Sequence, residues 1–259
     1  MKILILGGTG AMGKHLVQLL KHTNNHVVVT SRQPQTDDEN IHYAKGNAHD
    51  DTFLETLLEQ GFDVIIDFMA YNTKEFSLRY MKILKSCKQY IFLSSSRVYA
   101  ASEHPLTETS PRLLDVCKDD EYLSTDEYAL AKARQEDLLT NSGKNNYTIV
   151  RPYITYSENR LQLGVLEKES WLYRALKGRT IVFSEDIAKK YTTLTYGMDV
   201  SSGIIKLIGN EKAYGGVFHI TSNQSHPWEK VLHWYLDAIE QYSENRPRVR
   251  FEEKALNLK

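Results

Sequence analysis

The chain has 259 residues, of which 41% are hydrophobic and 25% charged, and its formal net charge at pH 7 is −1. A chain of this length and composition can bury a full core, as one large domain or as a domain with a smaller lobe. Its near-neutral charge gives no electrostatic reason to expect nucleic acid or an anionic membrane as a partner. Cys87 and Cys117 lack metal-ligand spacing, and the nine histidines include no paired-ligand motif, so no metal site is expected.

No apolar stretch of the sequence reaches the length of a membrane span. The apolar run at the N-terminus is only a strand's length before glycine, which is too short for a signal peptide. Two isolated cysteines suit a reducing compartment, so we expect a cytoplasmic protein.

Strands and helices alternate along the first half of the chain. Lys2–Leu6 is a continuous apolar run, as expected for a strand buried on both faces of a parallel sheet. Further strands are predicted at 26–30, 63–68, 89–94 and 147–150, and helices after Gly13, at 52–59, at 74–86 and from Tyr128 to about Thr140. This repetition predicts an α/β fold with a doubly wound, largely parallel (Rossmann) sheet, which binds ligands at the carboxyl ends of its strands.

The alternation weakens after Arg151-Pro152. Helices are predicted at 166–177, at 200–208 and from the Ser225-His226-Pro227 cap to about Tyr242, with extended segments at 191–196 and 216–220. We expect a dinucleotide-binding core from 1–153 and 196–222, and a smaller substrate lobe from 154–195 and 223–259. The segment 101–125 has no clear period, and loops of this length in compact domains are often functional lids.

The sequence Gly7-Gly8-Thr9-Gly10-Ala11-Met12-Gly13 joins the first strand to the first helix. In a dinucleotide-binding turn the first glycine permits the sharp bend, the second lets the backbone approach a pyrophosphate, and the last allows close helix–strand packing. The pyrophosphate then lies at the helix N-terminus, where unpaired N–H groups favour negative charge. The strand–turn–helix setting therefore predicts a nicotinamide dinucleotide as cofactor.

The residues that end the second strand bear on the choice between NAD and NADP. An acidic residue there would bind the ribose 2′-hydroxyl and repel a 2′-phosphate. The chain instead has Thr30-Ser31-Arg32, two hydroxyls followed by a guanidinium suited to phosphate. This favours NADP over NAD; the alternative is that Arg32 stacks on the adenine or lies in solvent.

Tyr128 and Lys132 are four residues apart and so lie on one face of a helix. The ammonium can lower the pKa of the phenol from its ordinary value of about 10 toward working pH, which would make Tyr128 a general acid/base. The spacing alone is weak evidence, because Tyr173 and Lys177 share it in what reads as a surface helix. Upstream, Ser94-Ser95-Ser96 ends an apolar strand, where a hydroxyl can hold the substrate oxygen while Tyr128 moves its proton.

In combination these motifs resemble the extended short-chain dehydrogenase/reductases, the NAD-dependent epimerase/dehydratase family, which acts mostly on nucleotide-activated sugars. The resemblance covers nearly the whole chain. It rests on Gly7-x-x-Gly10-x-x-Gly13, Phe92-Leu93-Ser94-Ser95-Ser96-Arg97-Val98-Tyr99, Tyr128-x-x-x-Lys132 with Glu136 following, Arg151-Pro152, Asp199-Val200 and Val217-Phe218-His219-Ile220.

The resemblance implies a role for each matched position. Ser95 would be the catalytic hydroxyl, Tyr128 the acid/base, and Lys132 would bind the nicotinamide ribose and depress the tyrosine pKa. The predicted cofactor-binding residues are Gly7, Thr9, Gly10, Ala11, Met12, Gly13, Ser31, Arg32, Asn47, Ala48, Phe68, Met69, Ala70 and Ser94, and the predicted substrate contacts are Ser96 and Tyr153.

Three departures from the family pattern bear on the reaction. Dehydratases carry an Asp-Glu pair where this chain has Ser96-Arg97, which argues against a 4,6-dehydratase. Many sugar-nucleotide enzymes have an asparagine for the substrate diphosphate where this chain has Ile154. Family members often continue for several dozen residues beyond the position of Lys259, which implies a truncated copy or an abbreviated substrate lobe.

Two functions from different classes follow from the sequence. The first is an NAD(P)-dependent epimerase or oxidoreductase acting on a sugar or sugar-nucleotide hydroxyl. The alternative is a non-catalytic dinucleotide-binding sensor or scaffold of the same fold. We expect a small-molecule substrate, no nucleic acid and no membrane as partners, and the sequence leaves a homodimer open.

Overall fold

The structure is a computed structural model, and it describes residues 1–254 of the chain. The chain divides into two compact units. The first consists of Met1–Tyr153 and Gly197–Ile220, and the second of Ile154–Tyr196 and Thr221–Lys259. The division into a dinucleotide-binding core and a substrate lobe stays a prediction.

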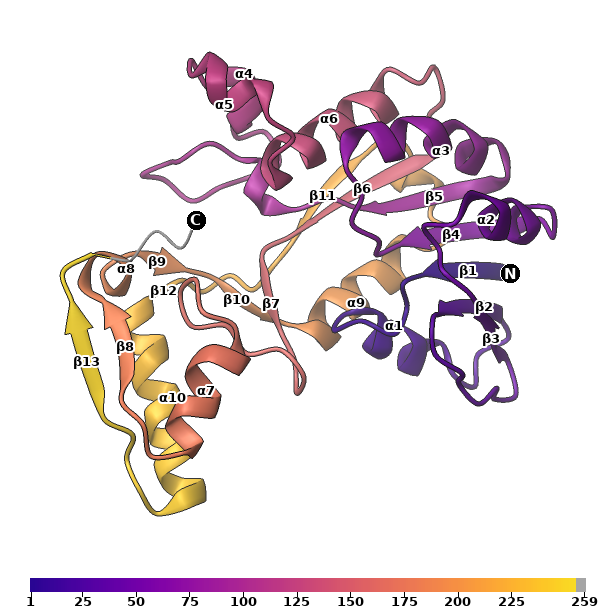
Figure 1. The fold of residues 1–259 in the computed structure, drawn as a ribbon. Coiled ribbons are helices and arrows are strands. Elements are labelled where there is room, and N and C mark those ends of the chain that lie inside the picture. Colours follow the sequence, from indigo (N-terminus) through magenta and orange to yellow (C-terminus); the bar gives the residue numbers. More distant parts are fainter. Residues whose placement is uncertain (255–259) are drawn as a thin grey trace. The chain divides into compact units, whose positions relative to one another are not determined.

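A parallel sheet of seven strands forms the centre of the first unit (Figure 1). Its strands are β1 (Lys2–Leu6), β2 (His26–Ser31), β3 (Ile41–Lys45), β4 (Phe62–Asp67), β5 (Cys87–Leu93), β6 (Tyr147–Pro152) and β11 (Val217–Ile220). They lie in the order β11-β6-β5-β4-β1-β2-β3, and every neighbouring pair is parallel. The predicted doubly wound parallel sheet is therefore confirmed.

Helices cover both faces of this sheet, α2, α3 and α6 on one face and α1 and α9 on the other (Figure 1). These helices are α1 (Gly13–Leu20), α2 (Asp51–Leu58), α3 (Thr73–Lys85), α6 (Tyr128–Thr140) and α9 (Gly197–Leu207), with shorter helical segments η1 (Ser96–Val98), α4 (Leu113–Val116), α5 (Asp120–Ser124) and η2 (Glu211–Ala213). Alternate residues of β1 point to opposite faces, Leu4 into one core and Ile5 into the other. Burial on both faces explains why β1 is apolar at every position from Ile3 to Leu6.

Two helices of this unit begin at side-chain caps that the sequence supplies. Asp50 accepts a hydrogen bond from the backbone N–H of Phe53 at 2.7 Å and starts α2. Asn72 does the same for the N–H of Glu75 and starts α3. Such caps contribute about 1 kcal/mol each and fix where the strand-to-helix connections end.

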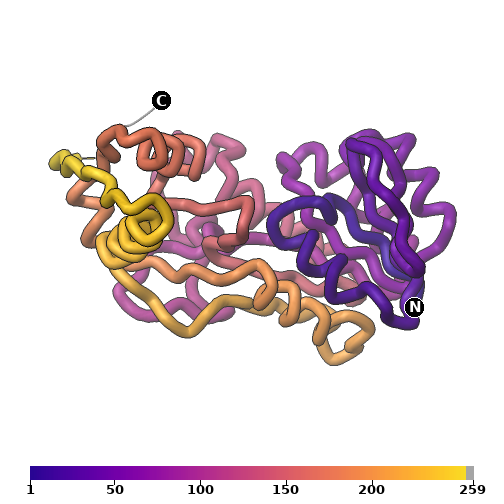
Figure 2. The backbone as a smooth tube through the Cα atoms, turned by 90° about the horizontal axis from the view of Figure 1, so that it is seen from below, coloured from indigo at the N-terminus to yellow at the C-terminus, as the bar shows by residue number. Residues whose placement is uncertain are grey.

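The segment from Gly197 returns to the first unit late in the chain. Figures 1 and 2 both show α9 beside α1, and the hydroxyl of Ser201 donates to the carbonyl of Met12 at 2.9 Å. The end of the glycine-rich turn is thus held by a helix that lies almost 190 residues further along the chain. This contact keeps the first turn of α1 in place.

Within residues 154–196 and 221–254, the second unit has three two-stranded sheets and three helices. These are β7 (Ile154–Tyr156) with β10 (Leu194–Tyr196), β8 (Ile181–Ser184) with β13 (Val249–Glu252), β9 (Tyr191–Thr192) with β12 (His226–Pro227), and the helices α7 (Lys168–Leu176), α8 (Glu185–Ala188) and α10 (Trp228–Ser243). Its core is formed by Trp171, Phe183, Trp228 and Leu232, among others. The sequence predicted α7, α10 and the extended 191–196 segment, and missed the pairing of β8 with β13.

Candidate functional site

The glycine-rich turn between β1 and α1 is held by contacts within the first unit. Gly7 has φ +73°, and its N–H donates to the hydroxyl of Thr30 at 3.0 Å. A Cβ added at Gly13 would lie 2.6 Å from the Cα of Gly8, so packing alone requires glycine there. A Cβ added at Gly10 would meet only the carbonyl oxygen of Gly7, at 3.6 Å. Because the chain leaves space beside Gly10, the glycine at this position suits a ligand that approaches the backbone closely.

The last glycine brings the start of α1 close to the chain that leaves β1. A Cβ on Gly13, the first residue of α1, would meet the backbone of Gly8, which lies two residues after β1. Gly8, which the sequence reading left without a role, is the residue that packs on the strands: its Cβ would lie 2.6 Å from Val29 and 2.9 Å from Ile5. A pair of glycines directly after a buried strand was the available signal.

The end of β2 lies beside this turn. Thr30 is engaged by Gly7, and the hydroxyl of Ser31 donates to the carbonyl of Gln33 at 2.8 Å. Both side chains are buried, whereas Arg32 is exposed and its guanidinium has no hydrogen-bond or ion-pair partner among residues 1–254. Of the three residues that favoured NADP, Arg32 is therefore the one whose side chain is available to a ligand.

The segment after β3 is fixed by a buried arginine that the sequence reading missed. Arg79 on α3 donates to the carbonyl oxygens of Ala48 at 3.1 Å and of His49 at 2.9 Å. It also pairs with Asp51 at 2.7 Å. Asn47 accepts from the N–H of His49 at 3.2 Å. The two predicted adenine contacts, Asn47 and Ala48, thus lie in a loop whose shape depends on Arg79.

The residues after β4 approach the glycine-rich turn. A Cβ on Gly7 would lie 2.9 Å from the sulfur of Met69 and 3.6 Å from the Cβ of Phe68. Phe68 and Met69 are half-buried and Ala70 is exposed. The structure therefore places this predicted cofactor segment beside the turn, at the carboxyl ends of β1 and β4.

The serines after β5 have three different environments. Ser94 is buried and its hydroxyl has no hydrogen-bond partner among the described residues. Ser95 caps η1 by accepting from the N–H of Arg97 at 3.1 Å. Ser96 is buried at the start of η1. A buried hydroxyl without a partner is unusual, so Ser94 has bonding capacity for a bound group, and Ser95 keeps its own O–H donor.

Arg97 connects the serine segment to the predicted acid/base residue. Tyr128 is the first residue of α6 and its side chain is 40% exposed. The guanidinium of Arg97 lies over the Tyr128 ring, 5.6 Å from its centroid, and donates to Glu127 at 2.7 Å. Arg97 therefore contacts Ser95 through its backbone N–H and Tyr128 through its guanidinium, a link that the sequence did not predict.

Lys132 lies one turn along α6 from Tyr128 and is only 2% exposed. Its ammonium donates to the carbonyl of Leu93 at 2.8 Å and to that of Met69 at 3.4 Å. Burial lowers the pKa of Lys132 to about 8, against the opposing effect of the negative charges of Asp67 and Glu136. A buried lysine with a lowered pKa at the carboxyl ends of strands is typical of a functional site.

Two further tyrosines entered the sequence analysis, Tyr153 as a predicted substrate contact and Tyr173 as a surface-helix residue. Tyr153 is half-buried directly after β6. Tyr173, the second tyrosine with a lysine four residues later, is 53% exposed on α7. Across residues 1–254, no group of three His, Cys, Asp or Glu side chains could hold a metal ion, and no helix has the length and apolar character to cross a membrane.

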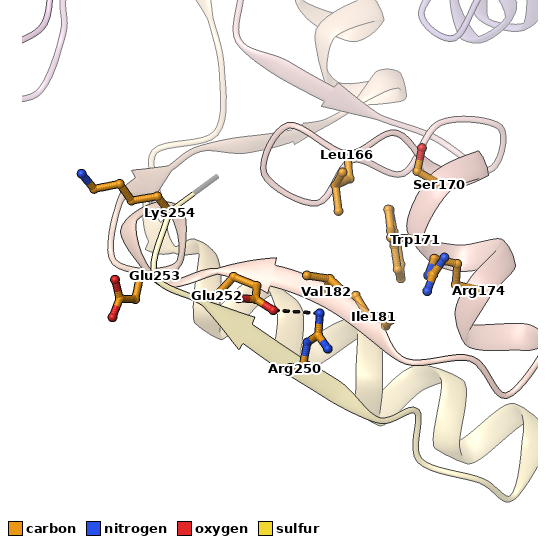
Figure 3. A pocket seen from close by; sticks show the side chains of 10 residues that line it. All are labelled: Leu166, Ser170, Trp171, Arg174, Ile181, Val182, Arg250, Glu252, Glu253 and Lys254. Atoms are coloured by element: carbon orange, nitrogen blue, oxygen red, sulfur yellow. Dashed lines mark ion pairs between the residues drawn. The ribbon is translucent and has the colours of Figure 1, made fainter. Parts of the chain in front are cut away.

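The second unit contains a cavity of about 860 Å³ that the sequence reading did not identify (Figure 3). It is lined by Leu166, Ser170, Trp171, Arg174, Ile181, Val182, Arg250, Glu252, Glu253 and Lys254. Arg250 and Glu252 form an ion pair at 2.8 Å. The lining comes from α7 and from the β8–β13 pair, which the sequence could not bring together because the two strands are almost seventy residues apart.

Comparison with known proteins identifies relatives of the chain. It is 26% identical over 239 residues to the chloroplast stem-loop binding protein of 41 kDa b of Arabidopsis thaliana, covering 86% of this chain and 59% of that protein. It is 22% identical over 240 residues to the 2′-dehydrokanamycin reductase of Streptomyces kanamyceticus, covering 89% of this chain and 64% of the reductase. The chain thus spans about three fifths of the length of these curated relatives.

The fold is shared with solved epimerases. The UDP-glucuronic acid 4-epimerase of Bacillus cereus in complex with NAD superimposes with a TM-score of 0.76, covering 98% of this chain and 86% of the epimerase at 19% identity. The sequence profile of the NAD dependent epimerase/dehydratase family matches residues 3–220. The chain therefore belongs to the NAD-dependent epimerase/dehydratase family.

Proposed function

We propose that this protein is an NAD(P)-dependent epimerase or oxidoreductase that acts on a hydroxyl of a sugar or sugar nucleotide. The observation that supports this most directly is the cluster at the carboxyl ends of β4 and β5. There Arg97 contacts both Ser95 and Tyr128, and the buried Lys132 stands one turn behind Tyr128. A tyrosine with a lysine one helical turn away can act as the group that removes a hydroxyl proton.

The residues at the carboxyl ends of β1 and β5 fit a nicotinamide dinucleotide. The space beside Gly10 would take the pyrophosphate at the start of α1, and the unpartnered hydroxyl of Ser94 would face the bound group. When bound, the nicotinamide accepts a hydride from the substrate carbon and can return it. The protein's own side chains would position the substrate and transfer its proton.

We assign a separate task to each side chain of the cluster. Tyr128 takes the proton from the substrate hydroxyl as the carbonyl forms, and gives it back in the reverse direction. Ser95 holds the same oxygen in position. The Lys132 ammonium stabilises the phenolate form of Tyr128 electrostatically and would hold a ribose hydroxyl of the cofactor.

The names of the relatives support both a net reduction and an epimerisation. One curated relative is a reductase and one structural neighbour is a 4-epimerase. Hydride return to the opposite face of the same substrate inverts the carbon, whereas return to a different substrate gives net reduction.

We further propose that the cofactor is NADP. Arg32 is exposed next to the glycine-rich turn, and no carboxylate occupies the end of β2 to repel a 2′-phosphate. The neighbours crystallised with NAD leave the preference of this chain open. We therefore treat NAD as the competing cofactor in every binding measurement.

A non-catalytic dinucleotide-binding protein is the second candidate. One observation favours it: a curated relative at 26% identity is named as a stem-loop binding protein and not as an enzyme. Ile154 also cannot make the polar contact that an asparagine would make at its position.

The test is mass spectrometry of the purified protein under native conditions, followed by turnover assays with a panel of sugar nucleotides and both cofactors. Tightly retained oxidised cofactor together with inversion of a sugar centre supports the epimerase, and exchangeable cofactor consumed in step with product supports the reductase. Cofactor binding without turnover of any member of the panel would favour the non-catalytic protein. Absence of cofactor binding would contradict both candidates.

A further inference from the structure

A buried aspartate lies directly behind the proposed catalytic cluster. Asp67 is the last residue of β4 and is fully buried. Its carboxylate accepts hydrogen bonds from the N–H of Met69 at 2.9 Å, the hydroxyl of Tyr90 at 2.8 Å and the hydroxyl of Tyr71 at 3.1 Å. The Met69 N–H can only donate, and each tyrosine hydroxyl can donate to an ionised carboxylate, which accepts at both of its oxygens.

The backbone holds Lys132 close to this carboxylate. Asp67 and Phe92 are paired in register across β4 and β5, and the Lys132 ammonium lies over the Phe92 ring at 4.5 Å. Met69 joins the two groups, since its N–H binds Asp67 while its carbonyl accepts from Lys132. The two charges therefore share one buried compartment without forming an ion pair within 4.0 Å, so far as residues 1–254 are concerned.

Other ionisable groups surround the pair. They are Tyr71 after β4, Arg79 on α3, Tyr90 on β5, Tyr128 and Glu136 on α6, and Arg151 on β6. Glu136 is the other carboxylate near Lys132, and both its oxygens accept from the guanidinium of Arg151, at 2.8 and 2.6 Å. Arg112 approaches it as well, at 3.5 Å. The charge of Glu136 is thus already matched by arginine, whereas the carboxylate of Asp67 is met by neutral donors.

We propose that Asp67 is a positioning residue that keeps Lys132 in its ammonium form beside Tyr128. A buried ammonium is costly unless a negative charge lies nearby. Asp67 supplies that charge, and Tyr71 and Tyr90 hold the carboxylate in place. The effect on Tyr128 rests on the proposed function, but the effect on Lys132 does not.

The direction of the effect follows from the buried setting. Burial lowers the pKa of Lys132, and the negative charge of Asp67 acts to raise it. Burial likewise raises the pKa of Asp67. The Met69 N–H, the Tyr90 hydroxyl and the Lys132 charge each act to lower it. If Asp67 is neutralised, burial is less opposed and Lys132 loses its proton at a lower pH. An opposite charge at short range is worth about one to three pKa units.

The test measures the titration of Lys132 directly in the full-length protein without substrate or cofactor. Protein labelled with 13C at the lysine ε-carbon is titrated by NMR, and the Lys132 signal is identified by its loss in Lys132→Arg. We expect the midpoint of Lys132 to fall by about one pH unit or more in Asp67→Asn. The matched control is Asp63→Asn, which removes a carboxylate near the opposite end of the same strand. It should leave the midpoint unchanged.

An unchanged midpoint in a folded Asp67→Asn protein would overturn the proposal. If Asp67→Asn does not fold, Tyr90→Phe serves in its place, because it removes one donor from the carboxylate and should lower the Lys132 midpoint by a smaller amount. With a substrate in hand, the alkaline limb of the kcat/KM profile should move to lower pH together with that midpoint. Absence of any turnover would count against the proposed function and leave the titration as the test of Asp67.

Discussion

Two helices of this protein carry a tyrosine followed four residues later by a lysine. Tyr128 and Lys132 lie on α6, and Tyr173 and Lys177 on α7. The spacing is identical, yet Lys132 is 2% exposed and Lys177 is an exposed residue at the C-terminal cap of its helix. Spacing brings the two side chains of each pair to one face, and the surrounding strands decide whether a chemical site results.

The difference begins with what each helix packs against. On α6, residues from Ala129 to Ala133 are all buried, so the helix lies within the core with little amphipathic character. On α7 only Trp171 and Ala175 are buried, and one side faces solvent. Lys132 therefore pays a desolvation cost that Lys177 avoids, and its charge acts in a poorly screened environment where it is more effective.

The largest expected difference between the pairs is catalytic. Tyr128→Phe removes one oxygen and keeps the ring beneath Arg97, so folding and cofactor binding should survive. A positioned proton-transfer group is worth about 10²–10⁴ in rate, and turnover should fall within that range. The measurement is steady-state turnover of the substrate found by screening. Tyr173→Phe is the matched control and should retain the parent rate; equal losses in both variants would show that α6 has no special role.

The second-largest expected difference is in the pH dependence of stability, which should differ between Lys132 and Lys177. The folded-state pKa of Lys132 is about 8, below its ordinary value of 10.5, so above pH 8 the unfolded chain binds the extra proton. Stability then rises with pH wherever the unfolded state binds more protons. The parent should gain on the order of 3 kcal/mol relative to Lys132→Met as the pH rises from about 8 to 10.5.

Urea unfolding at several pH values measures this gain. Lys177→Met should show no comparable dependence, because Lys177 is exposed in the folded protein as it is in the unfolded chain. A parent and a Lys132→Met protein whose stabilities run parallel between pH 8 and 10.5 would contradict a buried, titrating lysine.

The sequence predicted most of the sheet and a large part of the candidate site. Continuous apolar runs located β1, β2, β4, β5 and β6 within a residue or two, because strands buried on both faces carry mostly apolar residues. β3 was missed because it lies at the edge of the sheet with only β2 as a neighbour, so Ile41–Lys45 includes His42 and Lys45. The β8–β13 pair was missed because no local pattern specifies which distant segments will meet.

Buried polar residues were the other group that the sequence reading overlooked. Asp67 is a polar residue at the end of β4, and Arg79 is a polar residue on α3. Hydrophobic periodicity predicts that polar residues at such positions face solvent or cap a helix. Their burial depends on partners from other elements, Tyr90 for Asp67 and the carbonyl of Ala48 for Arg79. Ser95, Tyr128 and Lys132 were proposed from helical spacing and from the family motif, and their surroundings could not be foreseen from the sequence.

The third prediction tests the glycine-rich turn of the first unit, where the space beside Gly10 would accommodate a pyrophosphate. Gly10→Val should weaken cofactor binding by about 1–3 kcal/mol, because the new side chain enters the space beside the turn. Its melting temperature should change little, since the added Cβ meets only the Gly7 carbonyl, at 3.6 Å. Gly13→Ala should behave in the opposite way and destabilise the fold, because its Cβ would lie 2.6 Å from Gly8.

Isothermal titration calorimetry with each cofactor and thermal unfolding without cofactor give the two readouts. The expected pattern is lost affinity with retained stability in Gly10→Val, and lost stability in Gly13→Ala. Parent-like affinity in Gly10→Val would remove the turn from the cofactor site.

The smallest expected effect concerns the choice of cofactor. Arg32 is exposed after β2 without a partner among the residues that the structure describes, so Arg32→Ala should cost the fold almost nothing. A hydrogen bond to a charged group contributes about 1.5–3 kcal/mol, and solvent exposure reduces this, so NADP affinity should fall about tenfold while NAD affinity stays the same. Raising the salt concentration should narrow the NADP preference of the parent and not that of the variant, because only the parent pairs a guanidinium with a phosphate. Lys14→Ala is a suitable control, since it removes an exposed cation from α1 without altering the end of β2. If Arg32→Ala loses NAD and NADP affinity equally, Arg32 contacts a part that both cofactors share, and the end of β2 does not select NADP.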